Sequence, residues 1–117
     1  MEHYQVLYSP QAVDDLKGIF SYIAYELRVG ETAEKQVNRI RKAIRSLDYM
    51  PERYGRVEWE PWVSLNMHKL PVDNYIIFYQ VDSVGKTVTV VRIFYGGRNI
   101  EAMIRSDNEP PEKDENI

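Results

Sequence analysis

The sequence contains no cysteine and only two histidines, His3 and His68. The absence of thiols excludes disulfide bonds and thiolate chemistry, and it is compatible with a reducing compartment. Two histidines are too few for a histidine-rich metal site, so we expect neither a metal nor another cofactor. No apolar run approaches the roughly 18 residues that a membrane span needs, and no signal-peptide pattern opens the chain. We therefore expect a cytoplasmic protein that has no membrane partner.

Charge is distributed unevenly along the 117 residues, of which 44% are hydrophobic and 28% charged. This length and composition are typical of one soluble globular domain. Residues 107–117 contain five acidic side chains and Lys113, a balance of −4, whereas the other 106 residues carry 14 basic and 13 acidic side chains, a balance of +1. Because residues 107–117 include a Pro-Pro pair and almost no apolar side chain, they are predicted to form a disordered acidic tail after a domain of residues 1–106. An alternative is that this acidic tail shields a basic groove of the same chain.

The stretch of residues 74–98, NYIIFYQVDSVGKTVTVVRIFYGGR, is rich in β-branched and aromatic residues. It predicts a hairpin with strands over residues 75–81 and 87–95 and a turn between them. Both strands are apolar at nearly every position, so we expect the hairpin in the middle of a sheet with both faces covered. Arg92 breaks the apolar pattern. It must contact a carboxylate, reach solvent at a concave face, or bind an anionic ligand.

Two helices are predicted before this hairpin, after a short strand over residues 3–8. Ser9 and Pro10 begin the first helix, whose apolar stripe runs to Leu27 and which Gly30 ends as a left-handed cap. Thr32 caps the second helix, which stops before Pro51. Its outer face is basic, and this face is either solvated surface or an electrostatic footprint for nucleic acid or an acidic protein segment. The apolar stripe of the second helix is Ala33, Val37, Ile40, Ile44 and Leu47, and its basic face is Lys35, Arg39, Arg41, Lys42 and Arg45.

The remaining segments complete a sheet. Residues 62–70 are predicted to form a strand antiparallel to residues 75–81 across a turn at residues 71–74, and Asn99 can cap a short amphipathic turn through residue 104. The predicted fold class is therefore α+β, with an N-terminal strand, an antiparallel helical hairpin, and a mainly antiparallel sheet of three or more strands.

This β-α-α-β-β-β order resembles the RelE/ParE superfamily of bacterial toxins from type II toxin-antitoxin modules. The resemblance covers roughly residues 4–104 and rests on the segments YSPQAVDDLKGIFSYIA, NYIIFYQVD and VTVVRIFYGGR together with Leu47, Met50, Pro51, Gly55 and Arg56. It implies a growth-inhibiting toxin that a cognate antitoxin neutralises in a hetero-oligomer. One branch of the superfamily cleaves messenger RNA at the ribosome, and the other poisons DNA gyrase.

The first hypothesis is a metal-independent, ribosome-dependent endoribonuclease. Arg92 and Arg98 would grip the phosphate, because guanidinium groups are always charged and bind two oxygens at once. Tyr95 would act as an acid or stack on a base, and His68 or Glu58 would transfer a proton. Lys69 would add positive charge near the phosphate. Residues expected to bind RNA or a partner protein are Lys35, Arg39, Lys42 and Arg56.

Other roles remain open for the same residues. Arg92 can pair with Glu58 or Glu60 across the sheet, Tyr95 can lie at the edge of the core, and His68 can lie at the surface. Ribonuclease members of the superfamily usually carry an arginine where this chain has His68 and Lys69, and if neither residue replaces it the alternative is favoured. That alternative is a protein-binding inhibitor of DNA gyrase with no chemistry of its own. A third possibility is a degenerate module that only pairs with its antitoxin.

Overall fold

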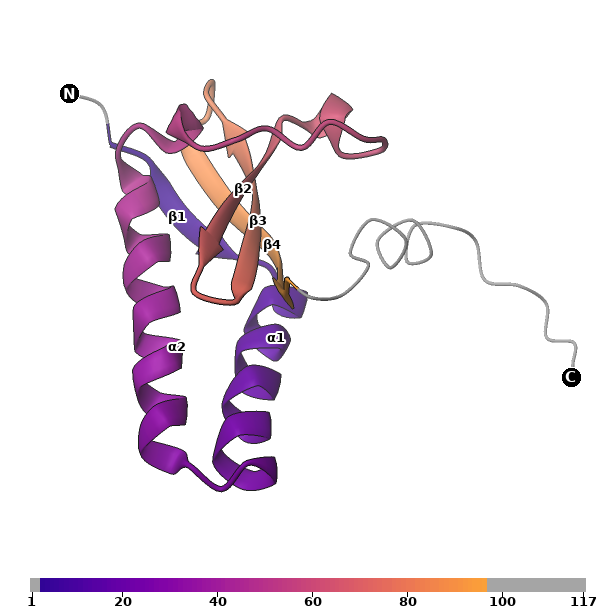
Figure 1. Cartoon of the computed structure of the whole chain (residues 1–117). Helices are drawn as coiled ribbons and strands as arrows, with labels where there is room; N and C mark the ends of the chain where they lie inside the picture. Colours follow the sequence, from indigo (N-terminus) through magenta and orange to yellow (C-terminus); the bar gives the residue numbers. More distant parts are fainter. Residues whose placement is uncertain (1–2, 97–117) are drawn as a thin grey trace, which may run out of the picture.

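The computed structural model describes residues 3–96 as a four-stranded sheet and two helices. The sheet order is β1-β4-β3-β2, in which β1 runs parallel to β4 and the other pairs are antiparallel. This arrangement confirms the predicted α+β fold, with a mixed sheet (Figure 1). The elements in chain order are β1 (Gln5–Tyr8), α1 (Pro10–Ser21), α2 (Gly30–Arg45), β2 (Met67–Val72), β3 (Tyr75–Asp82) and β4 (Thr87–Tyr95).

The start of α1 is the predicted one, but its end is not. The Ser9 side chain accepts a hydrogen bond from the Ala12 amide at 3.0 Å, and Pro10 is the first helical residue. The regular helix ends at Ser21 and continues as a π-helical turn, Tyr22–Glu26. The left-handed residue after this turn is Arg28, with φ of 60°, so the predicted cap at Gly30 is wrong.

Helix α2 begins at Gly30, two residues before the predicted cap Thr32. Val29 occupies the N-cap position without a side-chain hydrogen bond, and its carbonyl oxygen accepts from the Ala33 amide at 3.0 Å. The helix therefore starts without a capping hydroxyl, and Ala33 in its first turn is buried. The predicted apolar stripe is confirmed, since Ala33, Ile40, Ile44 and Leu47 are buried and Val37 is half-buried.

The predicted central hairpin is confirmed, because β3 and β4 are the two inner strands. Its turn is held by Asp82, whose Oδ1 accepts from the amides of Val84 at 3.1 Å and Gly85 at 3.0 Å. A bulge lies where Phe78 pairs with Arg92 and the next residue pairs with Val90. The helices cover one face of the sheet, where a core forms from Ala12, Leu16, Ile40, Ile44, Leu47, Leu70, Ile77, Tyr79, Val81, Val88, Val90 and Ile93.

The opposite face is covered by the segment between α2 and β2. Trp59 and Trp62 stack with ring centroids 5.4 Å apart, and Trp62 packs on Phe78 at 5.0 Å. This packing requires the chain to turn at Val63–Leu65 in a 3₁₀-helix, so the predicted strand over residues 62–70 is too long and β2 starts at Met67. The second core is Val57, Trp62, Met67, Phe78 and Phe94.

Strands β2 and β3 meet in a two-residue turn at Asp73 and Asn74, which is shorter than the predicted one. Asp73 has φ of 55°, the left-handed conformation that aspartate tolerates in turns. The predicted amphipathic turn at residues 99–104 and the acidic tail lie outside residues 3–96. Within those residues, no helix combines the length and the apolar character that crossing a membrane requires.

We predict that Tyr79→Phe destabilises the protein. The Tyr79 hydroxyl donates to the Pro51 carbonyl oxygen at 2.6 Å, and both groups are buried. Removing the hydroxyl leaves that carbonyl unpaired, so the free energy of unfolding in urea should fall by about 1–2 kcal/mol. The control is Tyr25→Phe, at a side chain that is 71% exposed, where we expect a change below about 0.5 kcal/mol. Equal stability of the two variants would contradict this role of the hydroxyl.

Candidate functional site

Arg92 lies in the part of β4 that extends beyond β1. There the N-terminal part of α1, instead of β1, is next to β4. Strand β1 pairs with β4 only as far as Val90. Beyond that point Ser9 donates through its amide to the Val90 carbonyl and through its hydroxyl to the Val91 carbonyl, both at 2.8 Å. Asp15 then accepts from the Ile93 amide at 2.8 Å. Helix α1 therefore satisfies the backbone groups at this edge of β4.

The Asp15 carboxylate also pairs with the Arg92 guanidinium. Nε of Arg92 lies 2.9 Å from Oδ2 and Nη2 lies 3.1 Å from Oδ1, so the contact is bidentate. Only 23% of the Arg92 side chain and 16% of the Asp15 side chain are exposed. Contact with a carboxylate was one of the three predicted possibilities for Arg92, and it is confirmed. The prediction that Glu58 or Glu60 provides this carboxylate is wrong. The reason is that helix α1 borders the strand at this point.

Lys69 and Arg92 share the sheet face opposite the helices. Lys69 pairs with Phe78 in the β2–β3 register, and Phe78 pairs with Arg92 in the β3–β4 register. Directly paired residues point to the same face, so the two cations stand on either side of Phe78, roughly 10 Å apart over two strand spacings. Lys69 is exposed, and the Arg92 guanidinium lies over the Phe94 ring, 4.4 Å from its centroid.

His68 points to the other face and is buried, with 2% of its surface exposed. Its Nδ1 lies 2.9 Å from the Tyr54 carbonyl oxygen, so Nδ1 carries the proton and donates it. The ring stacks on Tyr79 with centroids 5.6 Å apart, and Nε2 has no hydrogen-bond partner within the described part of the chain. The expected surface position is therefore wrong, because the β2 alternation turns His68 inward and Lys69 outward.

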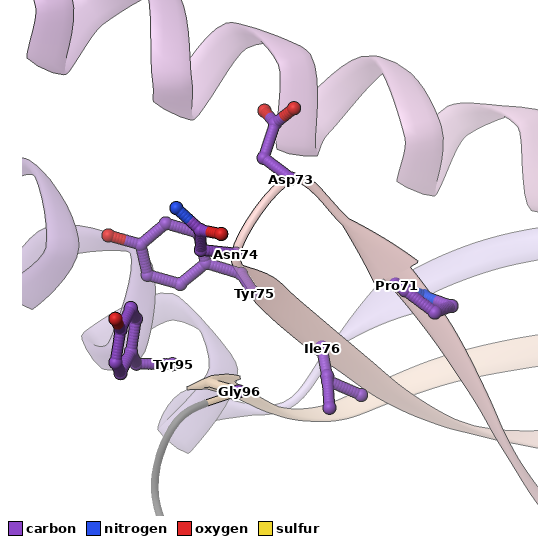
Figure 2. A pocket seen from close by; sticks show the side chains of 7 residues that line it. All are labelled: Pro71, Asp73, Asn74, Tyr75, Ile76, Tyr95 and Gly96. Atoms are coloured by element: carbon purple, nitrogen blue, oxygen red, sulfur yellow. The ribbon is translucent and has the colours of Figure 1, made fainter.

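Tyr95 borders a pocket at the end of the sheet. Its ring is 50% exposed and meets the Tyr75 ring edge-on, with centroids 5.9 Å apart. Burial raises the pKa of the Tyr75 phenol, and the nearby phenols of Tyr95 and Tyr22 raise it further. Tyr95 and Arg92 are an odd number of residues apart on β4, so their side chains leave opposite faces. The pocket has a volume of about 370 Å³. Its lining residues, shown in Figure 2, are Pro71, Asp73, Asn74, Tyr75, Ile76, Tyr95 and Gly96.

The basic candidates on α2 are exposed, and one of them is ion-paired. Nε of Arg39 lies 2.7 Å from Oδ2 of Asp73, in the β2–β3 turn, and Nε2 of Gln36 donates to the same oxygen at 2.9 Å. The hydrogen bond from Arg39, and next that from Gln36, lower the pKa of the Asp73 carboxyl. Lys35 and Lys42 are exposed above and below this pair.

Arg56 and Glu58 are described by the structure, whereas Arg98 is not. Arg56 and Glu58 are exposed on the segment that precedes β2, and the Arg56 backbone forms an isolated bridge with His68. Arg98 lies outside residues 3–96. The structure therefore brings Lys69 and Arg92 to one face but places His68 inside the protein and Tyr95 on the opposite side of the sheet. No cluster of three or more His, Asp or Glu side chains suited to a metal ion occurs among the described residues.

Sequence reasoning missed two acidic residues that organise these contacts. Asp15 directly precedes Leu16, a residue of the apolar stripe of α1, and this flanking position was a usable signal. Asp73 lies in a turn, where aspartate needs no partner to be explained. Its contact with Arg39 joins residues that are 34 positions apart, so no local pattern could reveal it.

Comparison with known proteins gives a consistent result. The family model described as the ParE toxin of the type II toxin-antitoxin system parDE matches residues 6–100. The chromosomal ParDE toxin-antitoxin system from P. aeruginosa is similar in structure, with a TM-score of 0.66 and 21% sequence identity over 80% of this chain and 96% of that chain. The comparison with curated proteins gives no match.

Two further solved structures share the fold at low sequence identity. The toxin-antitoxin complex RelBE2 from Mycobacterium tuberculosis has a TM-score of 0.59 and 17% identity, over 80% of this chain and 98% of that chain. The archaeal RelE-RelB complex from Pyrococcus horikoshii OT3 has a TM-score of 0.58 and 18% identity, over 82% of this chain and 98% of that chain.

We predict that Asp15→Asn destabilises the fold far more than Asp14→Asn. The two aspartates are adjacent, but Asp14 is exposed whereas Asp15 holds Arg92 and the Ile93 amide. Loss of these charge-assisted bonds should lower the free energy of unfolding by about 2 kcal/mol, and Asp14→Asn should change it by less than about 0.5 kcal/mol. Urea denaturation of both variants measures the difference. Similar values would show that the Asp15 contacts contribute little.

A second prediction concerns pH. Because the pKa of Asp73 is lower in the folded protein than its ordinary value, the Asp73 contacts stabilise the protein above about pH 4 and are lost as the pH falls through the lower folded value. The urea midpoint of the parent protein should therefore exceed that of Asp73→Asn at about pH 7 and match it at about pH 2. Asp14→Asn is the control and should show no such pH-dependent difference. A gap of equal size at both pH values would exclude this linkage.

Proposed function

Because this chain belongs to the ParE toxin family and is the toxin of a type II toxin-antitoxin module, we propose that it acts by binding DNA gyrase and has no chemistry of its own. A cognate antitoxin is its partner in the module. One contact favours this protein-binding hypothesis over the endoribonuclease hypothesis.

That contact is the ion pair between Arg92 and Asp15. A site that cleaves RNA without a metal needs cations free to stabilise the charge that develops on the phosphate. Two N–H groups of Arg92 already donate to Asp15, and the pair is mostly buried. Displacing Asp15 would also strip the Ile93 amide of its acceptor. The positive charge of Arg92, which is the candidate for binding phosphate, is therefore already neutralised by Asp15.

The proton-transfer candidates support the same choice. A general acid or base must come within hydrogen-bond reach of the substrate. His68 is enclosed by its contacts with Tyr54 and Tyr79, and Tyr95 lies on the other side of the sheet from Lys69 and Arg92. Lys69 is exposed on the face that Arg92 shares, and a lysine by itself does not supply acid, base and charge stabilisation together.

The connection between the helices suits a protein-binding toxin. Tyr22, Tyr25, Leu27 and Val29 are exposed there by 55%, 71%, 53% and 44%. Neighbouring exposed apolar side chains mark protein-binding surfaces, and tyrosines often provide their strongest contacts. The end of the helical hairpin therefore offers the kind of surface that seizing a protein target requires.

One observation favours the endoribonuclease as a second candidate. Lys69 is exposed on the sheet face that Arg92 shares. An exposed lysine at that place can contact a phosphate. In this case Lys69 would make the essential phosphate contact.

We predict that inducing the protein in bacteria causes filamentous growth and DNA breaks while messenger RNA stays intact, and that the purified protein inhibits gyrase supercoiling. Tyr25→Ala should weaken this inhibition about tenfold, since an exposed aromatic anchor contributes on the order of 1–2 kcal/mol to binding. Val84→Ala removes a 93% exposed side chain from the β3–β4 turn and is the matched control. Lys69→Ala should leave both readouts unchanged.

The endoribonuclease predicts the opposite pattern. Messages would be cut during translation, gyrase would keep its activity, and Lys69→Ala would abolish toxicity. That outcome would overturn the proposed function and support the second candidate.

A further inference from the structure

A cationic stripe runs along one side of α2. Lys35, Arg39 and Lys42 are spaced four and three residues apart, which places them on the same side of a helix. The stripe is roughly 10 Å long, as the helical rise over seven residues requires. The ion pairs within residues 3–96 involve Arg39 but neither Lys35 nor Lys42. Two exposed ammonium groups therefore flank Arg39 without an ion pair among the described residues.

The residue in the middle of the stripe, Arg39, already binds a carboxylate. Arg39 binds the Asp73 carboxylate at 2.7 Å, and Gln36 donates to the same oxygen at 2.9 Å. The carboxylate comes from the β2–β3 turn, and Figure 2 shows Asp73 directed toward the neighbouring helix. The stripe thus already binds one carboxylate of this chain, with a lysine on each side of it.

The described chain ends beside this contact. The Gly96 amide donates to the Asn74 carbonyl oxygen at 2.8 Å, and Asn74 directly follows Asp73. The residues after Gly96 consequently start next to the turn that touches the middle of α2. Figure 1 shows the end of β4 at the same end of the sheet as this turn.

The sequence that follows is long enough and has the complementary charge. Ten residues separate Gly96 from Asp107, and a chain of that length spans up to roughly 35 Å when extended. The acidic tail, residues 107–117, then carries five carboxylates against Lys113. Its charge of −4 is opposite to that of the stripe, and its reach is several times the length of the stripe.

We propose that the acidic tail folds back onto the cationic stripe, where its carboxylates pair with Lys35 and Lys42 on either side of the Arg39–Asp73 contact. Each exposed pair is weak and screened by salt. Tethering compensates for this weakness, because the tail is covalently joined to the domain and its effective concentration is on the order of millimolar. The tail therefore acts as an internal competitor, which any acidic protein segment or polyanion must displace to reach α2. This inference does not depend on whether gyrase is the target.

Zero-length carbodiimide cross-linking of the full-length protein tests the contact directly. We expect tail carboxylates to join Lys35 and Lys42, at a yield that does not change on dilution and that falls at about 1 M salt, where the Debye length is about 3 Å. Lys17 on α1 and Lys69 on β2 are exposed internal controls and should give little product. Equal labelling of all four lysines would overturn the proposal, as would products joining two chains whose yield falls on dilution.

A binding experiment tests the consequence with matched charge changes. One variant carries Glu112→Gln, Asp114→Asn and Glu115→Gln in the tail, and the control carries Asp14→Asn, Glu26→Gln and Glu58→Gln at exposed positions elsewhere. Both raise the net charge by the same amount. The probe is a labelled single-stranded DNA oligonucleotide at low salt.

The tail variant should bind this probe roughly fivefold more tightly than the parent, because two or three weak competing pairs are lost. The control variant should gain less than about twofold. Adding Lys35→Gln and Lys42→Gln to the tail variant should remove the gain. Equal gains in the tail and control variants would show that net charge alone acts, and the proposal would fail.

Discussion

The contact between Asp15 and β4 is the interaction on which the arrangement of this protein depends. Strand β1 is only four residues long, so the C-terminal half of β4 has no strand neighbour on the edge opposite β3. A strand edge with unpaired backbone groups is unstable and prone to pairing with other chains. Helix α1 solves this by placing Ser9 and Asp15 against the carbonyl and amide groups of β4. The orientation of α1 and the covering of the sheet follow from these bonds.

The same contact limits the chemistry of the protein. A carboxylate that accepts from both a backbone amide and a guanidinium cannot be released without losing both sets of bonds. Arg92 is thereby used as a structural cation, in a fold where an arginine at that place could otherwise bind phosphate. The burial of His68 has a similar effect, since the inward face of β2 packs on Tyr79 and Tyr54. A toxin that binds its target fits these constraints better than one that cleaves RNA.

The β2–β3 turn positions a second ion pair, between Asp73 and Arg39. Asp73 links this turn to α2, and the chain leaves β4 beside it. Residues that are far apart in the sequence, Arg39 of α2, Asp73 of the turn and Gly96 at the end of β4, are therefore brought together around this turn.

The sequence by itself determined the α+β order, the hairpin of β3 and β4, the apolar stripe of α2 and the start of α1 at Ser9. These features depend on alternation, helical spacing and capping, which act between residues close together in the chain. Only the tertiary structure decided that Arg92 pairs with Asp15, that His68 is buried, that Tyr95 leaves the sheet face opposite to Arg92, and that residues 62–66 turn instead of extending. Each of these depends on which distant element lies alongside: α1 at the edge of β4, Tyr79 beneath β2, and the stacked tryptophans over Phe78. Contacts of that kind join residues many positions apart, and one sequence carries no local signal for them.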